Sequence, residues 1–112
     1  REQGRVREAM LYCRMALARE PGFADAWYNL GDLAEVAGDP ALARRSLQRA
    51  LQCDAGFADA AFNLARLHYA AGAYEEAVAQ WQRYLDLDPD SPWARKARHG
   101  IALCRQQMRP RQ

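Results

Sequence analysis

The chain has 112 residues, of which 50% are hydrophobic and 27% charged, and its formal net charge is only +2. These values are typical of one globular domain with its own core, and no apolar run approaches the roughly 18 residues of a membrane-spanning helix. We therefore expect no membrane span and no signal peptide, although the chain begins without Met, in mid-repeat, and is interpreted as a fragment of a longer protein.

The sequence repeats with a period of 34 residues. The blocks at 23–26 and 57–60 are both Phe-Ala-Asp-Ala, and single residues recur in the same phase. The recurring residues include Gly4, Gly38 and Gly72, Ala9, Ala43 and Ala77, and Leu17, Leu51 and Leu85. A fixed period of this length is typical of a stacked array, in which each unit buries its apolar face against its neighbours.

Apolar stripes and helix-end residues predict six helices, over residues 4–20, 24–37, 40–53, 58–71, 74–87 and 92–108. Gly38 and Gly72 are placed to end helices, whereas Asp39-Pro40 and Ser91-Pro92 have the sequence of helix starts. We expect one domain: the second half of a repeat at 1–23, full repeats at 24–57 and 58–91, and a C-terminal capping helix and tail at 92–112.

The first predicted helix is apolar nearly all round. Its expected core side carries Val6, Met10, Cys13 and Leu17. Leu11, Tyr12 and Met15 add apolar side chains at positions where the later repeats are mostly polar. A helix of this kind is usually buried on more than one side, so these three residues are candidates for an oligomer interface that gives a homodimer or larger assembly. The alternative is that they are scattered surface residues.

The last predicted helix fits the repeat register poorly. A slip of one residue places Ala94, Ala97 and Ile101 on its core stripe, with Cys104 and Met108 continuing it. The opposite face is basic, and segment 92–112 contains six basic side chains and no acidic one. We therefore predict a terminal capping helix.

The pattern resembles the tetratricopeptide repeat. The positions that carry the resemblance are Trp27, Leu30, Gly31, Ala43, Leu47 and Ala50, then Leu64, Ala65, Ala77, Trp81 and Pro89, with Ala9, Ala16 and Pro21 in the half-repeat. Departures are Ala34 and His68 in place of Tyr, Ala61 in place of Trp, and Tyr84 in place of a small residue. The resemblance implies an all-α fold, a right-handed α–α superhelical solenoid of helix hairpins.

The resemblance also implies a concave peptide-binding groove, lined by the first helix of each repeat. Mapped onto this chain, its residues are Asp25, Tyr28, Asn29, Asp32, Phe62, Asn63, Arg66, Tyr69 and Lys96. Asn29 and Asn63 recur one repeat apart, and a carboxamide both donates to and accepts from a peptide backbone. The alternative is that the two amides only join neighbouring helices. The family's carboxylate clamp is disfavoured, because Asp25, Tyr28, Asp32 and Asp59 occupy its basic positions.

No motif for catalysis, cofactor binding or metal binding is found, and we expect none of these functions. His68 is predicted to be packed in the core and His99 to be solvated. The three cysteines, Cys13, Cys53 and Cys104, are too widely spaced for a disulfide framework and are interpreted as small buried side chains. This usage favours a reducing, cytoplasmic location.

Three functions fit the sequence. The leading hypothesis is a non-catalytic scaffold that binds a protein or peptide partner in the groove. The second is a self-assembly module. The third is the C-terminal part of a transcriptional regulator, since the stretch Trp81–Arg95 is similar to repeats that follow a MerR-type DNA-binding domain. We expect no nucleic-acid binding by this chain itself, because its basic residues are concentrated at one end.

Overall fold

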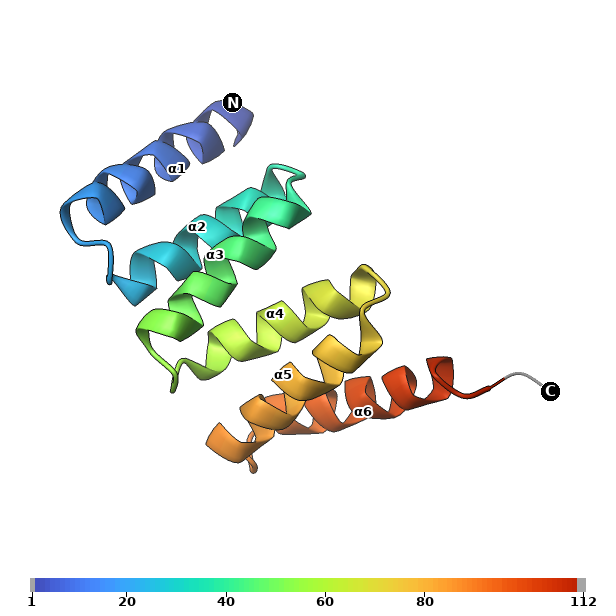
Figure 1. The fold of residues 1–112 in the computed structure, drawn as a ribbon. Helices are drawn as coiled ribbons and strands as arrows, with labels where there is room; N and C mark the ends of the chain where they lie inside the picture. Colours follow the sequence, from blue (N-terminus) through green and yellow to red (C-terminus); the bar gives the residue numbers. More distant parts are fainter. Residues whose placement is uncertain (1, 111–112) are drawn as a thin grey trace. The chain divides into compact units, whose positions relative to one another are not determined.

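The computed structural model describes residues 2–110, which contain helices and turns but no strand (Figure 1). The helices are α1 (Glu2–Arg19), α2 (Ala24–Val36), α3 (Pro40–Cys53), α4 (Ala58–Ala70), α5 (Tyr74–Leu87) and α6 (Pro92–Gln107). Every boundary lies within about two residues of the predicted one, inside the usual uncertainty of such assignments. The all-α fold class is confirmed.

The helix ends follow the chemistry of the residues found there. Gly38 and Gly72 have φ values of 81° and 78°, a left-handed conformation that costs a side-chain-bearing residue free energy. Asp39 caps α3 by accepting a hydrogen bond from Leu42 N at 3.1 Å. Ser91 caps α6 by accepting one from the backbone N–H two residues after Pro92, at 3.3 Å. Both predicted Asp-Pro and Ser-Pro starts are confirmed.

The chain forms two compact units, a first that ends at Ala60 and a second that starts at Ala61. In the first unit, α2 packs against both α1 and α3. The helices α2 and α3 approach closely at Gly31, where an added Cβ would lie 3.0 Å from Leu47 Cγ. The apolar core of this unit comprises Met10, Leu17, Ala26, Leu30, Ala34, Ala43, Leu47, Ala50, Leu51 and Ala60.

In the second unit, the aromatic rings of α4 and α5 join the helices. The ring of Phe62 meets those of Trp81 and Tyr84 edge-on, with centroids 6.3 and 5.2 Å apart. The helix α6 packs against α5 so closely that a Cβ on Gly100 would lie 2.5 Å from Trp81 Cη2. Only glycine fits at this position without a shift of the ring.

The one-residue slip predicted for the last helix is confirmed over most of its length. Ala94, Ala97, Ile101 and Cys104 are all buried, at 4% exposure or less. The extension of the stripe to Met108 is wrong, since this side chain is 40% exposed. Met108 is the residue that follows α6, so it lies beyond the packed part of the helix.

A hydrogen-bonded group fixes the turn between α5 and α6. The Tyr84 hydroxyl donates to Asp88 Oδ2 at 2.6 Å and lies 3.1 Å from Ser91 Oγ. These contacts tie the last turn of α5 to the residue that caps α6. The hydroxyl of Tyr84, followed by that of Ser91, lowers the pKa of the Asp88 carboxyl from its ordinary value of 3.8, because a hydrogen bond to the charged form favours that form.

This lowered pKa predicts a pH effect on stability. Because the pKa of Asp88 is lower in the folded chain than in the unfolded one, ionised Asp88 stabilises the fold above about pH 4, and this contribution is lost as the pH falls through the folded value. Asp88→Asn should therefore reduce the difference between the unfolding free energies at pH 6 and pH 3, measured by urea titration. Asp86→Asn, at an exposed neighbouring position, is the control, and equal pH dependence in both variants would contradict the prediction.

The cysteine prediction is wrong for Cys53, which is exposed, whereas Cys104 is buried and Cys13 half-buried. Cys53 is the last residue of α3, at the edge of the packed face, and its Sγ lies 3.9 Å from the carbonyl oxygen of Pro21. A periodic apolar stripe predicts which side of a helix is buried, but not the residue at which the neighbouring helices stop covering that side. His99 is exposed, as predicted, whereas His68 is half-buried and not fully packed in the core.

Candidate protein-binding surfaces

The first unit carries the four groove residues predicted on α2. Asp25 and Asn29 are exposed, and Tyr28 and Asp32 are half-buried. At about 100° per residue these four positions share one side of the helix. The ring of Tyr28 stacks on Phe57, with centroids 4.9 Å apart and planes 27° apart. This face therefore combines a fixed aromatic ring, an exposed carboxamide and two carboxylates.

The second unit carries the remaining groove residues, on α4 and α6. Asn63 is half-buried and Arg66 exposed. Phe62 and Tyr69, predicted as apolar contacts for a partner, are half-buried and already touch other rings of this unit. Tyr69 lies between Tyr74 and Trp81, with centroids at 5.5 and 6.1 Å. The stacking of the Asn29 and Asn63 amides remains a prediction.

Sequence reasoning missed Trp93 as a candidate for this surface. Trp93 is 53% exposed, although Phe62 meets its ring edge-on at 5.4 Å. On the same helix, Lys96 Nζ lies 4.3 Å from the Trp93 ring centroid, which is within the range of a cation–π contact. The sequence contains a signal for this residue. Trp93 is a large aromatic side chain directly after Ser91-Pro92, in the first turn of the last helix, and it does not belong to the core stripe of that helix.

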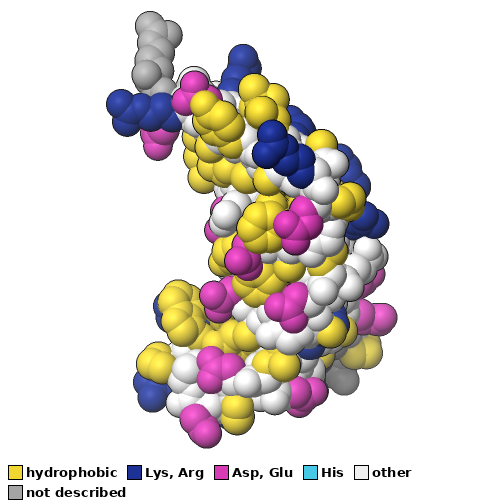
Figure 2. All heavy atoms as spheres, turned by 90° about the vertical axis from the view of Figure 1, so that its left-hand side faces the viewer, with side chains coloured by type: hydrophobic (Ala, Val, Ile, Leu, Met, Phe, Trp, Pro, Cys, Tyr) yellow, Lys and Arg dark blue, Asp and Glu magenta, His cyan; other side chains and the backbone are white. Residues whose placement is uncertain are grey.

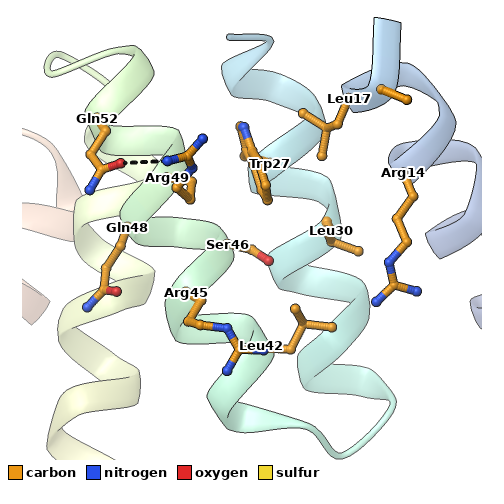
Figure 3. A pocket seen from close by; sticks show the side chains of 11 residues that line it. Arg14, Leu17, Trp27, Leu30, Leu42, Arg45, Ser46, Gln48, Arg49 and Gln52 are labelled. Atoms are coloured by element: carbon orange, nitrogen blue, oxygen red, sulfur yellow. Dashed lines mark hydrogen bonds between the residues drawn. The ribbon is translucent and has the colours of Figure 1, made fainter. Parts of the chain in front are cut away.

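A pocket of about 590 Å³ lies on the first unit, between α1, α2 and α3 (Figure 3). Its lining residues are Arg14, Leu17, Ala18, Trp27, Leu30, Leu42, Arg45, Ser46, Gln48, Arg49 and Gln52. Trp27 is fixed by a hydrogen bond from its Nε1 to the Pro21 carbonyl at 2.8 Å, and by the Arg49 guanidinium 5.2 Å from its ring centroid. None of these residues was predicted to form a site.

The exposed side of α1 is strongly apolar. Leu11, Tyr12 and Met15 are 56%, 61% and 51% exposed. In Figure 2, hydrophobic side chains lie between basic ones at the top of the view, where α1 lies. A second pocket, of about 520 Å³, is formed by α1 with Ala37 and Asp39, and Leu11 contributes to its lining. The oligomer interface at these three residues remains a prediction.

Over residues 2–110 the structure contains no group of three or more His, Cys, Asp or Glu side chains that could hold a metal ion. Within the same range, no helix has the length and apolar character needed to cross a membrane.

Two models of one protein family, the tetratricopeptide repeat, match the chain, one over residues 36–98 and the other over residues 1–56. Together they cover both full repeats and the first half-repeat identified from the 34-residue period. No curated protein sequence matches the chain.

Similar solved structures include MamA and two proteins with a bound peptide. MamA has a TM-score of 0.82 at 21% sequence identity. The match covers 90% of this chain but only 54% of the MamA chain, and this chain covers 58% of the MamA chain in a second structure. The first TPR of Spaghetti (RPAP3), bound to the HSP90 peptide SRMEEVD, has a TM-score of 0.83 at 19% identity, covering 96% of this chain and 82% of that one. The Yersinia enterocolitica type III secretion chaperone SycD, in complex with a peptide of the translocator YopD, has a TM-score of 0.86 at 14% identity, covering 96% and 86%. These likenesses confirm the helical-solenoid fold.

Proposed function

The chain belongs to the tetratricopeptide repeat family, and from this we propose that it is a non-catalytic protein-interaction scaffold that binds a peptide or partner segment. Two of the similar structures, those of RPAP3 and SycD, contain a bound peptide. We place binding on the predicted groove faces, that of α2 in the first unit and that of α4 with α6 in the second.

The exposed Trp93 is the observation that supports this proposal most strongly. Large exposed aromatic side chains are enriched among residues that dominate binding free energy, and Trp93 is 53% exposed in the isolated chain. The Phe62 ring and the Lys96 ammonium hold it from two sides, so little side-chain entropy is lost when a partner covers it. A partner segment with an apolar side chain next to a carboxylate or a backbone carbonyl fits this arrangement.

The face of α2 selects by charge and by backbone hydrogen bonding. Asn29 is exposed and offers both a donor and an acceptor. The carboxylates of Asp25 and Asp32 share this face and repel an acidic peptide. We therefore propose a ligand that is neutral or basic where it meets α2, and not an acidic C-terminal tail of the kind that a carboxylate clamp holds.

A partner captured from a lysate with this chain as bait would test the scaffold. Trp93→Ala, and separately the pair Asn29→Ala with Asn63→Ala, are each expected to weaken that partner at least tenfold, which corresponds to about 1.4 kcal/mol, with helicity by circular dichroism unchanged. Leu87→Ala is the matched control, because Leu87 is 43% exposed but lies at the end of α5, off these faces. If the Asn29→Ala, Asn63→Ala double variant binds the partner with wild-type affinity, the two amides have a structural role. If this double variant and Trp93→Ala both bind with wild-type affinity, the groove proposal is refuted.

A second candidate function is self-assembly through α1. More than half of the surface of Leu11, Tyr12 and Met15 is exposed, and burial of each such side chain contributes up to about 1.5–3 kcal/mol. A second copy of the chain is one surface that can cover this face.

Self-assembly predicts a homodimer or larger species whose fraction rises with concentration in light scattering across a dilution series. Leu11→Ser combined with Met15→Ser should return it to a monomer, whereas Leu87→Ser, at an exposed position on another helix, should not. A wild-type chain that stays monomeric at the highest concentration would rule this function out.

A further inference from the structure

The pocket between α1, α2 and α3 is separate from the proposed groove. Trp27 and Leu30 line the pocket, and on a helix that turns about 100° per residue they lie on the side of α2 opposite to Asp25 and Asp32. Figure 3 shows its side chains converging from all three helices, with those of α3 on one side and those of α1 on the other. At about 590 Å³ it falls within the usual size of ligand sites.

The pocket has an apolar floor and a basic rim. Leu17, Leu30 and Leu42 supply aliphatic surface, together with the ring of Trp27. Arg14, Arg45 and Arg49 stand around it, and no acidic side chain is among its lining residues. Arg49 is engaged with Trp27 and with Gln52, at 3.4 Å. Arg14 and Arg45 are exposed, so their guanidinium groups are accessible to a ligand that enters the pocket.

One buried polar group in the pocket has no partner. Ser46 is fully buried, and its Oγ makes no hydrogen bond within the described part of the chain. In Figure 3 the Ser46 side chain points from α3 toward α2, below Trp27 and beside Leu30. Nearly all buried hydroxyls in folded proteins are hydrogen-bonded, but Ser46 has no exposed surface, so a ligand in the pocket reaches its Oγ only if neighbouring side chains move.

We propose that this pocket is a second binding site, which takes an acidic peptide segment with one bulky apolar side chain. The apolar side chain enters between Leu17, Trp27 and Leu30, and flanking carboxylates meet Arg14 and Arg45, whose guanidinium groups match carboxylates in geometry. An aliphatic floor favours a peptide side chain over a nucleic-acid phosphate. The helix α2 thus separates a face that carries Asp25 and Asp32 from a pocket rimmed by arginine, and the two sides select ligands of opposite charge.

Fluorescein-labelled decapeptides with a central Leu, Phe or Trp flanked by Glu and Asp test this site by anisotropy, against matched peptides with Lys in place of the acidic residues. We expect saturable binding of acidic peptides, and at least tenfold weaker binding of the basic ones at this site. Arg14→Glu with Arg45→Glu should weaken acidic-peptide binding at least tenfold. Arg5→Glu with Arg44→Glu makes the same charge change on the same two helices away from the pocket, and should have a much smaller effect.

Further variants separate this site from the groove. Trp93→Ala and Asn29→Ala should leave unchanged the part of acidic-peptide binding that depends on Arg14 and Arg45, so failure here and failure of the groove proposal are distinguishable. The pocket proposal is overturned if no acidic peptide binds, if the two arginine pairs have equal effects, or if labelled single-stranded DNA binds as tightly with the same dependence on Arg14 and Arg45.

Discussion

Replacing Gly100 by Ala is expected to destabilise the second unit, although alanine favours helix formation more than glycine. The new Cβ would lie 2.5–2.7 Å from three ring carbons of Trp81, well inside van der Waals contact. Trp81 is 5% exposed and touches the rings of Phe62 and Tyr69, so it has little freedom to move. Overpacking of this kind costs about 1–3 kcal/mol and outweighs the gain in helix propensity of up to about 1 kcal/mol.

Gly4→Ala is the matched control for Gly100→Ala. Gly4 also lies inside a helix, but no side chain or neighbouring helix comes within 4 Å of the position that a new Cβ would occupy. Its replacement should therefore stabilise α1 by up to about 1 kcal/mol. Urea titrations of the two variants should thus shift in opposite directions. A Gly100→Ala chain as stable as the wild type would show that α5 and α6 separate more easily than this packing implies.

Truncation of Leu47 to Ala should lower the free energy of unfolding of the first unit by about 2–5 kcal/mol. Leu47 is 1% exposed and faces Gly31, where α2 and α3 approach closely. Gly31→Ala alone crowds Leu47, but in the Leu47→Ala background the added methyl group enters the space that the leucine leaves. The two substitutions should therefore be non-additive, with the double variant more stable than the sum of the single effects predicts.

Hydrogen exchange measured by mass spectrometry separates the two units in this experiment. Leu47→Ala should reduce amide protection in α2 and α3 first, since these helices hold the cavity. Val36→Ala is the control in the same unit, because Val36 is 63% exposed and surface substitutions usually change stability by less than about 0.5 kcal/mol. Additive effects of Gly31→Ala and Leu47→Ala would contradict the close contact between α2 and α3.

The helices and their boundaries could be predicted because they depend on local chemistry. Gly38, Gly72, Asp39 and Ser91 determine where the backbone can leave or enter a helix, and each acts within a few residues of its own position. The core stripe of α6 could be predicted equally well, because Ala94, Ala97 and Ile101 are three and four residues apart, as expected for one side of a helix. The 34-residue period then identified the family.

The surfaces were less predictable, because they depend on contacts between residues distant in sequence. The close fit of Gly100 to Trp81 joins two helices, and no local pattern distinguishes this glycine from one at a helix end. Ser46 looked like an ordinary polar position, yet it is fully buried at the wall of a pocket that three helices form. The exposure of Trp93 likewise depends on which side of α6 the second unit covers.

The unequal exposure of the three thiols gives the chain one preferred position for chemical labelling. Burial raises the pKa of Cys13 and of Cys104, which lowers the fraction of reactive thiolate at neutral pH, and Cys104 is in addition fully buried. Cys53 is exposed at the end of α3. A maleimide dye should therefore attach to Cys53 first, close to the basic pocket, where its emission can report the arrival of a peptide without any engineered cysteine.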